Sequence, residues 1–220
     1  MAYPNPPCAS SRVILLGGGG HALVLWSILE GDGVTIVGFT DPSGGSHLKE
    51  RCPYLGHDDQ VTTYDPEDVL LVNGLGSVRT LAPRRRLFDT FKADGYAFAT
   101  VLHDRAIVDR HATIETGVQV MAGAVVQADA HVSANTLINT GAVVDHGCRV
   151  GAHCHVASGA TLSGDVQLGS EVHVGTGAAV IQGVSIGDRS VVGAGAVVVK
   201  DVPADTVVVG VPARPMTRSR

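Results

Sequence analysis

An aliphatic residue occupies every sixth position of residues 143–168, which read VVDHGCRVGAHCHVASGATLSGDVQL. The same spacing continues in both directions without a break, from Val108 to Val198. A small residue follows four positions after most of these aliphatic residues, as at Ala142, Cys148 and Ala160. A six-residue period fits neither an α-helix nor a plain strand, but it fits a coil of short strands that end in corners. The segment therefore predicts a parallel β-helix of hexapeptide repeats, with one bulky and one small inward side chain per hexad.

The composition agrees with a narrow core and argues against several classes of protein. The chain has 220 residues, a formal net charge of −5, and 45% hydrophobic but only 4% aromatic residues, so valine, alanine and glycine must do most of the packing. The negative charge gives no general attraction to nucleic acid, and no apolar run is long enough to span a membrane. We therefore expect a cytoplasmic protein, in which Cys148 and Cys154 pack as small inward residues and form no disulfide or metal site.

Strand-like and helix-like segments alternate ahead of the repeat, which predicts a Rossmann-like α/β domain that begins with a βαβ unit. The expected strands cover 12–16, 34–39, 69–73 and 96–100, the expected helices cover 22–30 and 83–94, and 43–66 is rich in loops. The predicted organisation is a flexible N-terminal tail (1–11), a βαβ domain (12–100), the β-helix (101–202) and a C-terminal tail (203–220).

Two glycine-rich turns are candidates for a nucleotide site. Gly17-x-Gly19-x-x-Ala22 matches the dinucleotide fingerprint between a strand and a helix, and Asp41 follows the next strand. Such glycines let backbone amides approach a phosphate at a helix N-terminus. Gly74-Leu75-Gly76 should lie at the same carboxyl edge of the sheet. Fewer than a hundred residues precede the repeat, which favours a mononucleotide over NAD, and a tight turn without a ligand is the structural alternative.

His146 differs from the other histidines of the repeat. In coils of about 18 residues, its neighbours one coil away are Ala128 and Gly164, so an open slot should lie beside it. Gly164 would also offer an unobstructed N–H, and a base beside an amide donor suits acyl transfer. The same arithmetic stacks His155 on His173. A zinc site is not expected, because no two histidines are five residues apart, as they are in β-helix carbonic anhydrases.

Several short motifs, taken together, carry a family resemblance. They are Gly17–His21, Asp41, the hexad run, Asn139-Thr140-Gly141, Asp145-His146, Cys154-His155-Val156 and Gly210-Val211-Pro212-Ala213. With them, residues 12–216 resemble the bacterial nucleotide-sugar acetyltransferases, which include N-acetyltransferases of UDP-linked 4-amino-sugars and of GDP-perosamine, and sialic acid O-acetyltransferase-like relatives. The resemblance implies a left-handed β-helix, a homotrimer with active sites between subunits, and acetyl-CoA as co-substrate with no metal. It places the sugar nucleotide on the domain at 12–100 and acetyl transfer on the β-helix.

The resemblance also implies residue roles. His146 matches the catalytic base, and Gly164 matches the amide that meets the thioester of acetyl-CoA. Other matches line the active site (Asn139, Asp145, His155), follow the coenzyme's arm (Gly175, Ala194, Lys200) or bind the sugar nucleotide (Gly17, Gly19, Gly20, His21, Asp41, Gly76). Some members carry Glu directly after the catalytic His, where this chain has Gly147. Asp145 precedes the histidine instead and, in a strand, should point to the opposite side.

These observations predict an acetyl-CoA-dependent N-acetyltransferase of glycan biosynthesis, such as that of O-antigen. It would acetylate the 4-amino group of a nucleotide-linked 4-amino-4,6-dideoxy sugar by direct transfer, with His146 as general base. One alternative is an O-acetyltransferase that acts on a sugar or sialic acid with the same scaffold. A second is a non-catalytic trimer that binds a nucleotide-sugar. The choice between UDP and GDP, and the sugar epimer, stay open.

Overall fold

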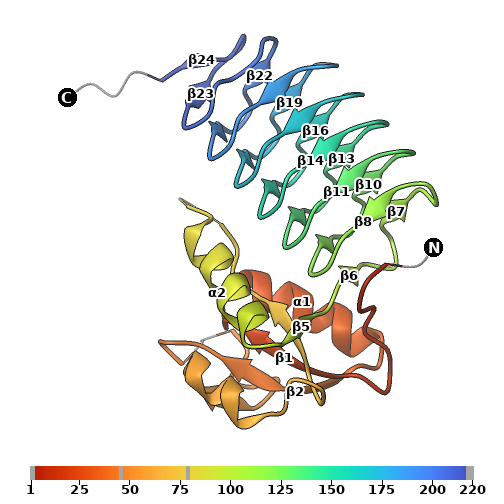
Figure 1. Ribbon diagram of the computed structural model, residues 1–220, viewed down its shortest axis with the longest axis vertical. Coiled ribbons are helices and arrows are strands. Elements are labelled where there is room, and N and C mark those ends of the chain that lie inside the picture. The colour runs from red at the N-terminus through yellow and green to blue at the C-terminus, as the bar shows by residue number, and fades with distance from the viewer. Residues whose placement is uncertain (1–2, 45–46, 78–79, 217–220) are drawn as a thin grey trace. The chain divides into compact units, whose positions relative to one another are not determined.

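A computed structural model describes residues 3–44, 47–77 and 80–216 (Figure 1). The chain divides into two compact units, of which the first is Pro4–Val101 and the second begins at Leu102. Tyr3 belongs to the second unit, where it packs against the β-helix core. Asn5 bonds to the backbone of Phe98 and Thr100 in the first unit, so residues 3–5 have defined contacts although a flexible tail was expected there.

The first unit is a five-stranded parallel sheet with the strand order β3-β2-β1-β4-β5. Its elements are β1 (Arg12–Leu16), α1 (Gly20–Gly31), β2 (Thr35–Thr40), β3 (Tyr54–Gly56), the 3₁₀ helix η1 (Asp58–Thr63), β4 (Leu70–Asn73), α2 (Ala82–Ala93) and β5 (Ala97–Phe98). The Rossmann-like prediction is confirmed, and its four strands and two helices are found within a few residues. Only β3 and η1 were missed, because a three-residue edge strand carries no apolar period. Successive strands are added on one side of β1 up to β3 and then on its other side from β4. Ligands of such sheets bind at the point between β1 and β4 where this order changes.

The second unit is the predicted parallel β-helix, in which nearly every hexad contributes one two-residue strand. Three flat sides are stacked from these strands, with each strand paired to the strand 18 residues away, as Val143 is to Thr161. Side 1 contains β6 (Val101–Leu102), β9 (Gln119–Val120), β12 (Leu137–Ile138), β15 (His155–Val156), β18 (His173–Val174), β21 (Val191–Val192), β23 (Val207–Val209) and β24 (Arg214–Pro215). Side 2 contains β7 (Ile107–Val108), β10 (Val125–Val126), β13 (Val143–Val144), β16 (Thr161–Leu162), β19 (Ala179–Val180) and β22 (Val197–Val198). Side 3 contains β8 (Thr113–Ile114), β11 (His131–Val132), β14 (Arg149–Val150), β17 (Gln167–Leu168) and β20 (Ser185–Ile186).

The predicted inward residues form one continuous core. The second residue of almost every strand is buried, and so are the small residues four positions later, including Ala124, Ala142, Cys148 and Ala160. Every hexad also places one corner residue in the left-handed backbone region, without interruption from Gly117 to Gly195. Glycine and short polar residues tolerate this conformation best, so this second six-residue signal explains the eight glycines, Asn135, Asp129 and Asp165 at these corner positions.

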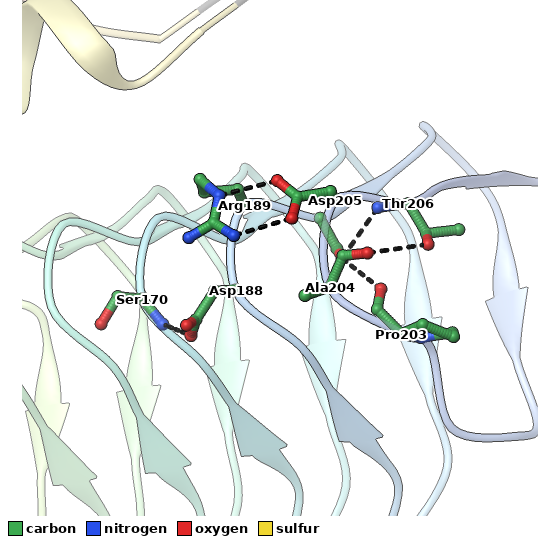
Figure 2. Close-up of polar contacts among 8 residues, drawn as sticks. Ser170, Asp188, Arg189, Pro203, Ala204, Asp205 and Thr206 are labelled. Atoms are coloured by element: carbon green, nitrogen blue, oxygen red, sulfur yellow. Dashed lines mark hydrogen bonds and ion pairs between the residues drawn. The ribbon is translucent and has the colours of Figure 1, made fainter.

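The corners form three edges, named here by the sides they join: edge 1–2, edge 2–3 and edge 3–1. Edge 3–1 carries a ladder of polar contacts between successive coils (Figure 2). Arg189 donates to both carboxylate oxygens of Asp205 at 2.7 Å, and Asp188 accepts the N–H of Ser170 at 2.8 Å. Because Arg189 and Asp205 are open to solvent, this pair adds little to stability and serves to align neighbouring corners.

The segment expected as a C-terminal tail contributes a further coil. Val192 of β21 pairs with Val208 of β23, sixteen residues on, whereas Val174 pairs with Val192, eighteen residues on. This coil is two residues shorter than the others, so its inward residues do not continue the six-residue spacing of the preceding repeats. The coil therefore cannot be recognised from that spacing. β24 then closes the end as an antiparallel partner of β23. Among the described residues, no helix combines the length and apolar character that a membrane crossing requires.

Replacing Val156 by Asp should unfold the β-helix. Val156 is fully buried, and an unpaired carboxylate there has no partner, so we expect a loss of more than about 4 kcal/mol. The matched control is Gln167→Asp at an exposed strand position, for which we expect a change within about 0.5 kcal/mol. Thermal unfolding followed by circular dichroism measures both. Equal stability of the two variants would mean that Val156 has been wrongly assigned to the inward, buried residues of the β-helix.

Candidate active site

His146 lies on edge 2–3, between β13 and β14, with its side chain exposed. Its imidazole rests directly against the backbone of Gly164 on the next coil: a Cβ at residue 164 would stand 2.5 Å from both Cε1 and Nε2 of the ring. Only glycine fits beneath the ring in this position. The space that the missing side chain of Gly164 leaves is therefore occupied by the ring of His146 and is not an open slot.

The N–H of Gly164 is one of several corner amides without a recorded acceptor among the described residues, as are those of Ala128 and Ser158. At the same corner position, Thr140 and His146 donate to Oδ1 of the preceding Asn139 and Asp145, at 2.8 and 2.7 Å. The N–H groups of Gly164's chain neighbours, Ser163 and Asp165, bond to carbonyl oxygens of adjacent coils. Among the described residues, no hydrogen-bond acceptor is recorded for the N–H of Gly164. A buried amide donor without an acceptor, beside an imidazole, is suited to bind a carbonyl oxygen of a ligand.

Asp145 and Gly147 flank His146, and both have structural roles in the corner. Asp145 accepts the backbone N–H of His146 and thereby closes the corner. Gly147 is in the left-handed region at φ +66, and a Cβ there would collide with the carboxylate of Asp165 on the next coil. A glutamate at residue 147 would therefore require Asp165 to move.

A second polar group lies on edge 1–2. Nδ2 of Asn139 and Nε2 of His155 are 3.1 Å apart, and His155 is almost completely buried. The ring of His155 meets that of His173 edge to face, with centroids 5.0 Å apart and planes at 80°. This is the stack that the 18-residue coil predicted, since β15 pairs with β18 in register. Burial lowers the pKa of His173.

The predicted β-helix site residues divide between the two edges that bound side 2. His146, Gly164 and Lys200 follow edge 2–3, and Lys200, three coils beyond His146, is about 14 Å away along the axis. Asn139, Gly175 and Ala194 belong to edge 1–2, with His155 beside them. Gly175 also has a packing role, because a Cβ there would lie 2.6 Å from the N atom of Ala194. Within one chain, His146 and Asn139 therefore lie on different edges.

The two glycine turns of the first unit converge as predicted. Gly17 has φ +100, and a Cβ there would lie 3.0 Å from Leu75. A Cβ at Gly74 would lie 2.8 Å from that of Ala22, and one at Gly76 would lie 3.5 Å from that of His21. Both turns therefore need glycine for close approach, and His21 stands next to the second turn.

Asp41 and the start of α1 shape the first turn. Oδ2 of Asp41 accepts the N–H of Gly18 at 2.8 Å, while Oδ1 accepts both the N–H and the hydroxyl of Ser43. Gly19 is the N-cap of α1, and no described side chain caps that helix. A Cβ at Gly19 or Gly20 would meet no atom within 4 Å. The side-chain positions of Gly19 and Gly20 are thus open, which leaves room for a phosphate to approach the start of α1.

Arg84 is a supporting residue that the sequence interpretation missed. It is completely buried on α2, and its Nη1 donates to the carbonyl oxygens of Asn73 and Leu75 at 2.9 and 2.8 Å. Burial lowers the pKa of this guanidinium to about 9. By holding both carbonyls, Arg84 fixes the path of the Gly74–Gly76 turn. It is the first of three consecutive arginines, and nothing in the sequence separates it from its exposed neighbour Arg85.

The buried cysteines offer no nucleophile. Sγ of Cys148 donates to Ser163 O at 3.2 Å, and Sγ of Cys154 donates to Gly169 O at 3.0 Å. Burial raises the pKa of both thiols, that of Cys154 to about 12. Both cysteines are free, as predicted for small packing residues. The described part of the chain contains no group of three or more His, Cys, Asp or Glu side chains arranged to hold a metal ion.

Comparisons with known proteins agree with this geometry. The family described as the PglD N-terminal domain matches residues 12–91. The acetyltransferase domain of PglB from Neisseria gonorrhoeae FA1090 is 33% identical, with a TM-score of 0.87 over 93% of this chain and 99% of that domain. PerB from Caulobacter crescentus, solved with CoA and GDP-perosamine, is 34% identical, with a TM-score of 0.85 over 94% of this chain and 98% of that chain.

A third solved structure shows the fold alone. WeeI from Acinetobacter baumannii AYE is 20% identical, with a TM-score of 0.80 over 94% of this chain and 100% of that chain. No curated protein sequence matches the chain. Two relatives above 30% identity span nearly the whole of both chains, which establishes the left-handed hand of the β-helix and the relationship itself. The chain therefore belongs to the family of nucleotide-sugar N-acetyltransferases built on a left-handed β-helix.

Proposed function

We propose that this protein transfers the acetyl group of acetyl-CoA to the 4-amino group of a nucleotide-linked 4-amino-4,6-dideoxy sugar. The observation that carries the proposal is the imidazole of His146, held against Gly164 beside an N–H for which no acceptor is recorded among the described residues. The relatives support the substrates, since PerB was solved with CoA and GDP-perosamine and the Neisseria domain with acetyl coenzyme A.

In this mechanism, His146 accepts a proton from the sugar's amino group as its nitrogen attacks the thioester carbonyl carbon. The N–H of Gly164 donates to the thioester oxygen, where negative charge develops. The C–S bond then breaks, the coenzyme leaves as the thiol after it receives a proton, and the amide product remains. Transfer is direct, because Cys148 donates inward to a corner carbonyl and cannot face the substrate.

Assembly as a homotrimer completes this site. The outward residues of side 2 are small or apolar: Ile107, Val125, Val143, Thr161, Ala179 and Val197. Those of side 3 are polar: Thr113, His131, Arg149, Gln167 and Ser185. Ile107, with 64% of its surface exposed, is the most open member of side 2. If side 2 faces the three-fold axis, edge 2–3 of one copy meets edge 1–2 of the next, and His146 meets a neighbour's Asn139.

The same arrangement leaves room for the coenzyme's arm. Edge 1–2 carries five left-handed glycines at which a Cβ would meet no atom within 4 Å: Gly123, Gly141, Gly159, Gly177 and Gly195. Opposite them, edge 2–3 would present Gly164, then Ile181, which is 44% exposed, and then Lys200. The thioester would lie at Gly164, the apolar arm along Ile181, and a phosphate near the ammonium of Lys200.

Replacing Gly19 by Val should raise KM for the sugar nucleotide far more than KM for acetyl-CoA. Gly19 has extended backbone (φ −80, ψ −171), and a Cβ there has no neighbour within 4 Å, so valine fits the fold. Its methyl groups would instead occupy the path of the phosphates to α1. Steady-state kinetics with each substrate varied in turn checks this, with unchanged thermal unfolding as the control. Equal effects on both KM values would mean that this turn does not hold the nucleotide.

The activity itself is tested by release of CoA thiol in the presence of acetyl-CoA and GDP- or UDP-linked 4-amino-4,6-dideoxy sugars. The matched control substrates carry a 4-hydroxyl group in place of the amine. We expect turnover with an amine and none with its hydroxyl counterpart. Turnover with only the hydroxyl compound would establish an O-acetyltransferase and overturn the proposal.

A further inference from the structure

We propose that His173 is a positioning residue: its ring holds His155, which in turn fixes Asn139 for the substrate. The proposal rests on the proposed function, in which edge 1–2 of one copy faces His146 of another. It adds a residue, on the coil beyond His155, that touches neither substrate.

The orientation of the Asn139 amide follows from a backbone contact. The N–H of Thr140 can only donate, and it bonds to Oδ1 of Asn139 at 2.8 Å. Nδ2 of Asn139 therefore faces His155, and Nε2 of His155, 3.1 Å away, must accept. His155 is thus neutral, with its proton on Nδ1. One N–H of the Asn139 amide is left to donate to a ligand.

This contact directs the amide only if the ring of His155 is itself held. In the register of side 1, His155 stands between Leu137 and His173. Leu137 is buried on one side, and the ring of His173 packs edge to face at 5.0 Å on the other. Removing the His173 ring would open a space into which His155 could turn, and the Nε2 contact with Asn139 would be lost.

His131 supplies a matched comparison. It occupies the same outward strand position as His155 and His173, but on side 3, where its Nε2 lies 2.6 Å from Glu115. Its neighbour one coil on is Arg149 and not a histidine. No residue of side 3 has a place in the proposed site, so His131 controls for the loss of a histidine from the β-helix surface.

The test compares His173→Ala, His173→Phe and His131→Ala in the full-length protein. We expect His173→Ala to lower kcat by about 2- to 10-fold, the range that an aromatic edge contact is worth. Phenylalanine retains the ring, so His173→Phe should restore most of the activity, and His131→Ala should match the wild type. The second readout is ¹⁵N NMR of labelled histidines, which reports which ring nitrogen carries the proton. The wild type and His173→Phe should show His155 with a bare Nε2, and His173→Ala should lose that signature.

Two results would overturn the proposal: an unchanged His155 signature and kcat in His173→Ala, or a loss in His173→Phe equal to that in His173→Ala. The second result would assign the effect to the imidazole's chemistry and not to its packing. The NMR readout needs no substrate. If the wild type shows no acetyl transfer, the proposed function fails, while the His155 signature still decides whether His173 positions the ring.

Discussion

Replacing His146 by Asn should lower kcat by about 10² to 10⁴, the usual contribution of general-base catalysis. Asparagine keeps a polar side chain of similar reach above Gly164 but cannot accept the proton of the attacking amine. KM for both substrates should stay nearly unchanged, because the lost interaction belongs to the transition state. Steady-state release of CoA thiol measures both constants.

His131→Asn is the matched control for this prediction, since His131 is on the polar side 3 and bonds to Glu115. It should cost little activity. Near wild-type turnover in His146→Asn would place the base elsewhere. The structure makes His155 a poor substitute, because its Nε2 already accepts from Asn139.

Replacing Gly164 by Ala should lower kcat by about 10², because it displaces the proposed general base. The new Cβ would stand 2.5 Å from the His146 ring, so the exposed imidazole must swing away from the thioester position. The backbone of Gly164 is outside the left-handed region, and alanine should therefore leave the fold and thermal unfolding almost unchanged. The control Gly31→Ala places its Cβ in open space at the end of α1 and should have no effect on kcat.

The double variant His146→Asn with Gly164→Ala tests whether both changes act through one ring. Residues that act as a unit are strongly non-additive, so the double variant should be little worse than His146→Asn alone. Fully additive losses would mean that Gly164 and His146 contribute independently, contrary to the geometry of edge 2–3.

Much of the β-helix followed from the sequence because its coils contain no insertions. A constant coil of 18 residues converts sequence distance directly into height along the axis, so His146 could be placed on Gly164 and His155 on His173. The glycine turns were equally accessible, since Gly17 and Gly74 are required by backbone conformation and close approach. These features are local or strictly periodic, which is why one chain sufficed to predict them.

Other features depend on contacts that no pattern encodes. The last coil was mistaken for a tail because two missing residues break the period before Val208. Arg84 supports a glycine turn from within a run of three arginines, and only the packing of α2 decides which one is buried. The division of Asn139 and His146 between two edges also escaped notice, because the sequence places them only seven residues apart. In the proposed site, the two residues meet only between two copies of the chain.

The central claim is that one active site combines edge 2–3 of one copy with edge 1–2 of the next, and mixed trimers test it most directly. His146→Asn disables the contribution of edge 2–3. Ala194→Trp should disable the contribution of edge 1–2, because the tryptophan would block the coenzyme's arm at an exposed corner. Each variant alone should be a nearly inactive trimer. After equal amounts are unfolded and reassembled together, random cyclic trimers have both edges intact at about a quarter of their interfaces. We predict recovery of about a quarter of wild-type activity. No recovery from well-formed mixed trimers would contradict a shared site, and so would an Ala194→Trp variant that is fully active alone.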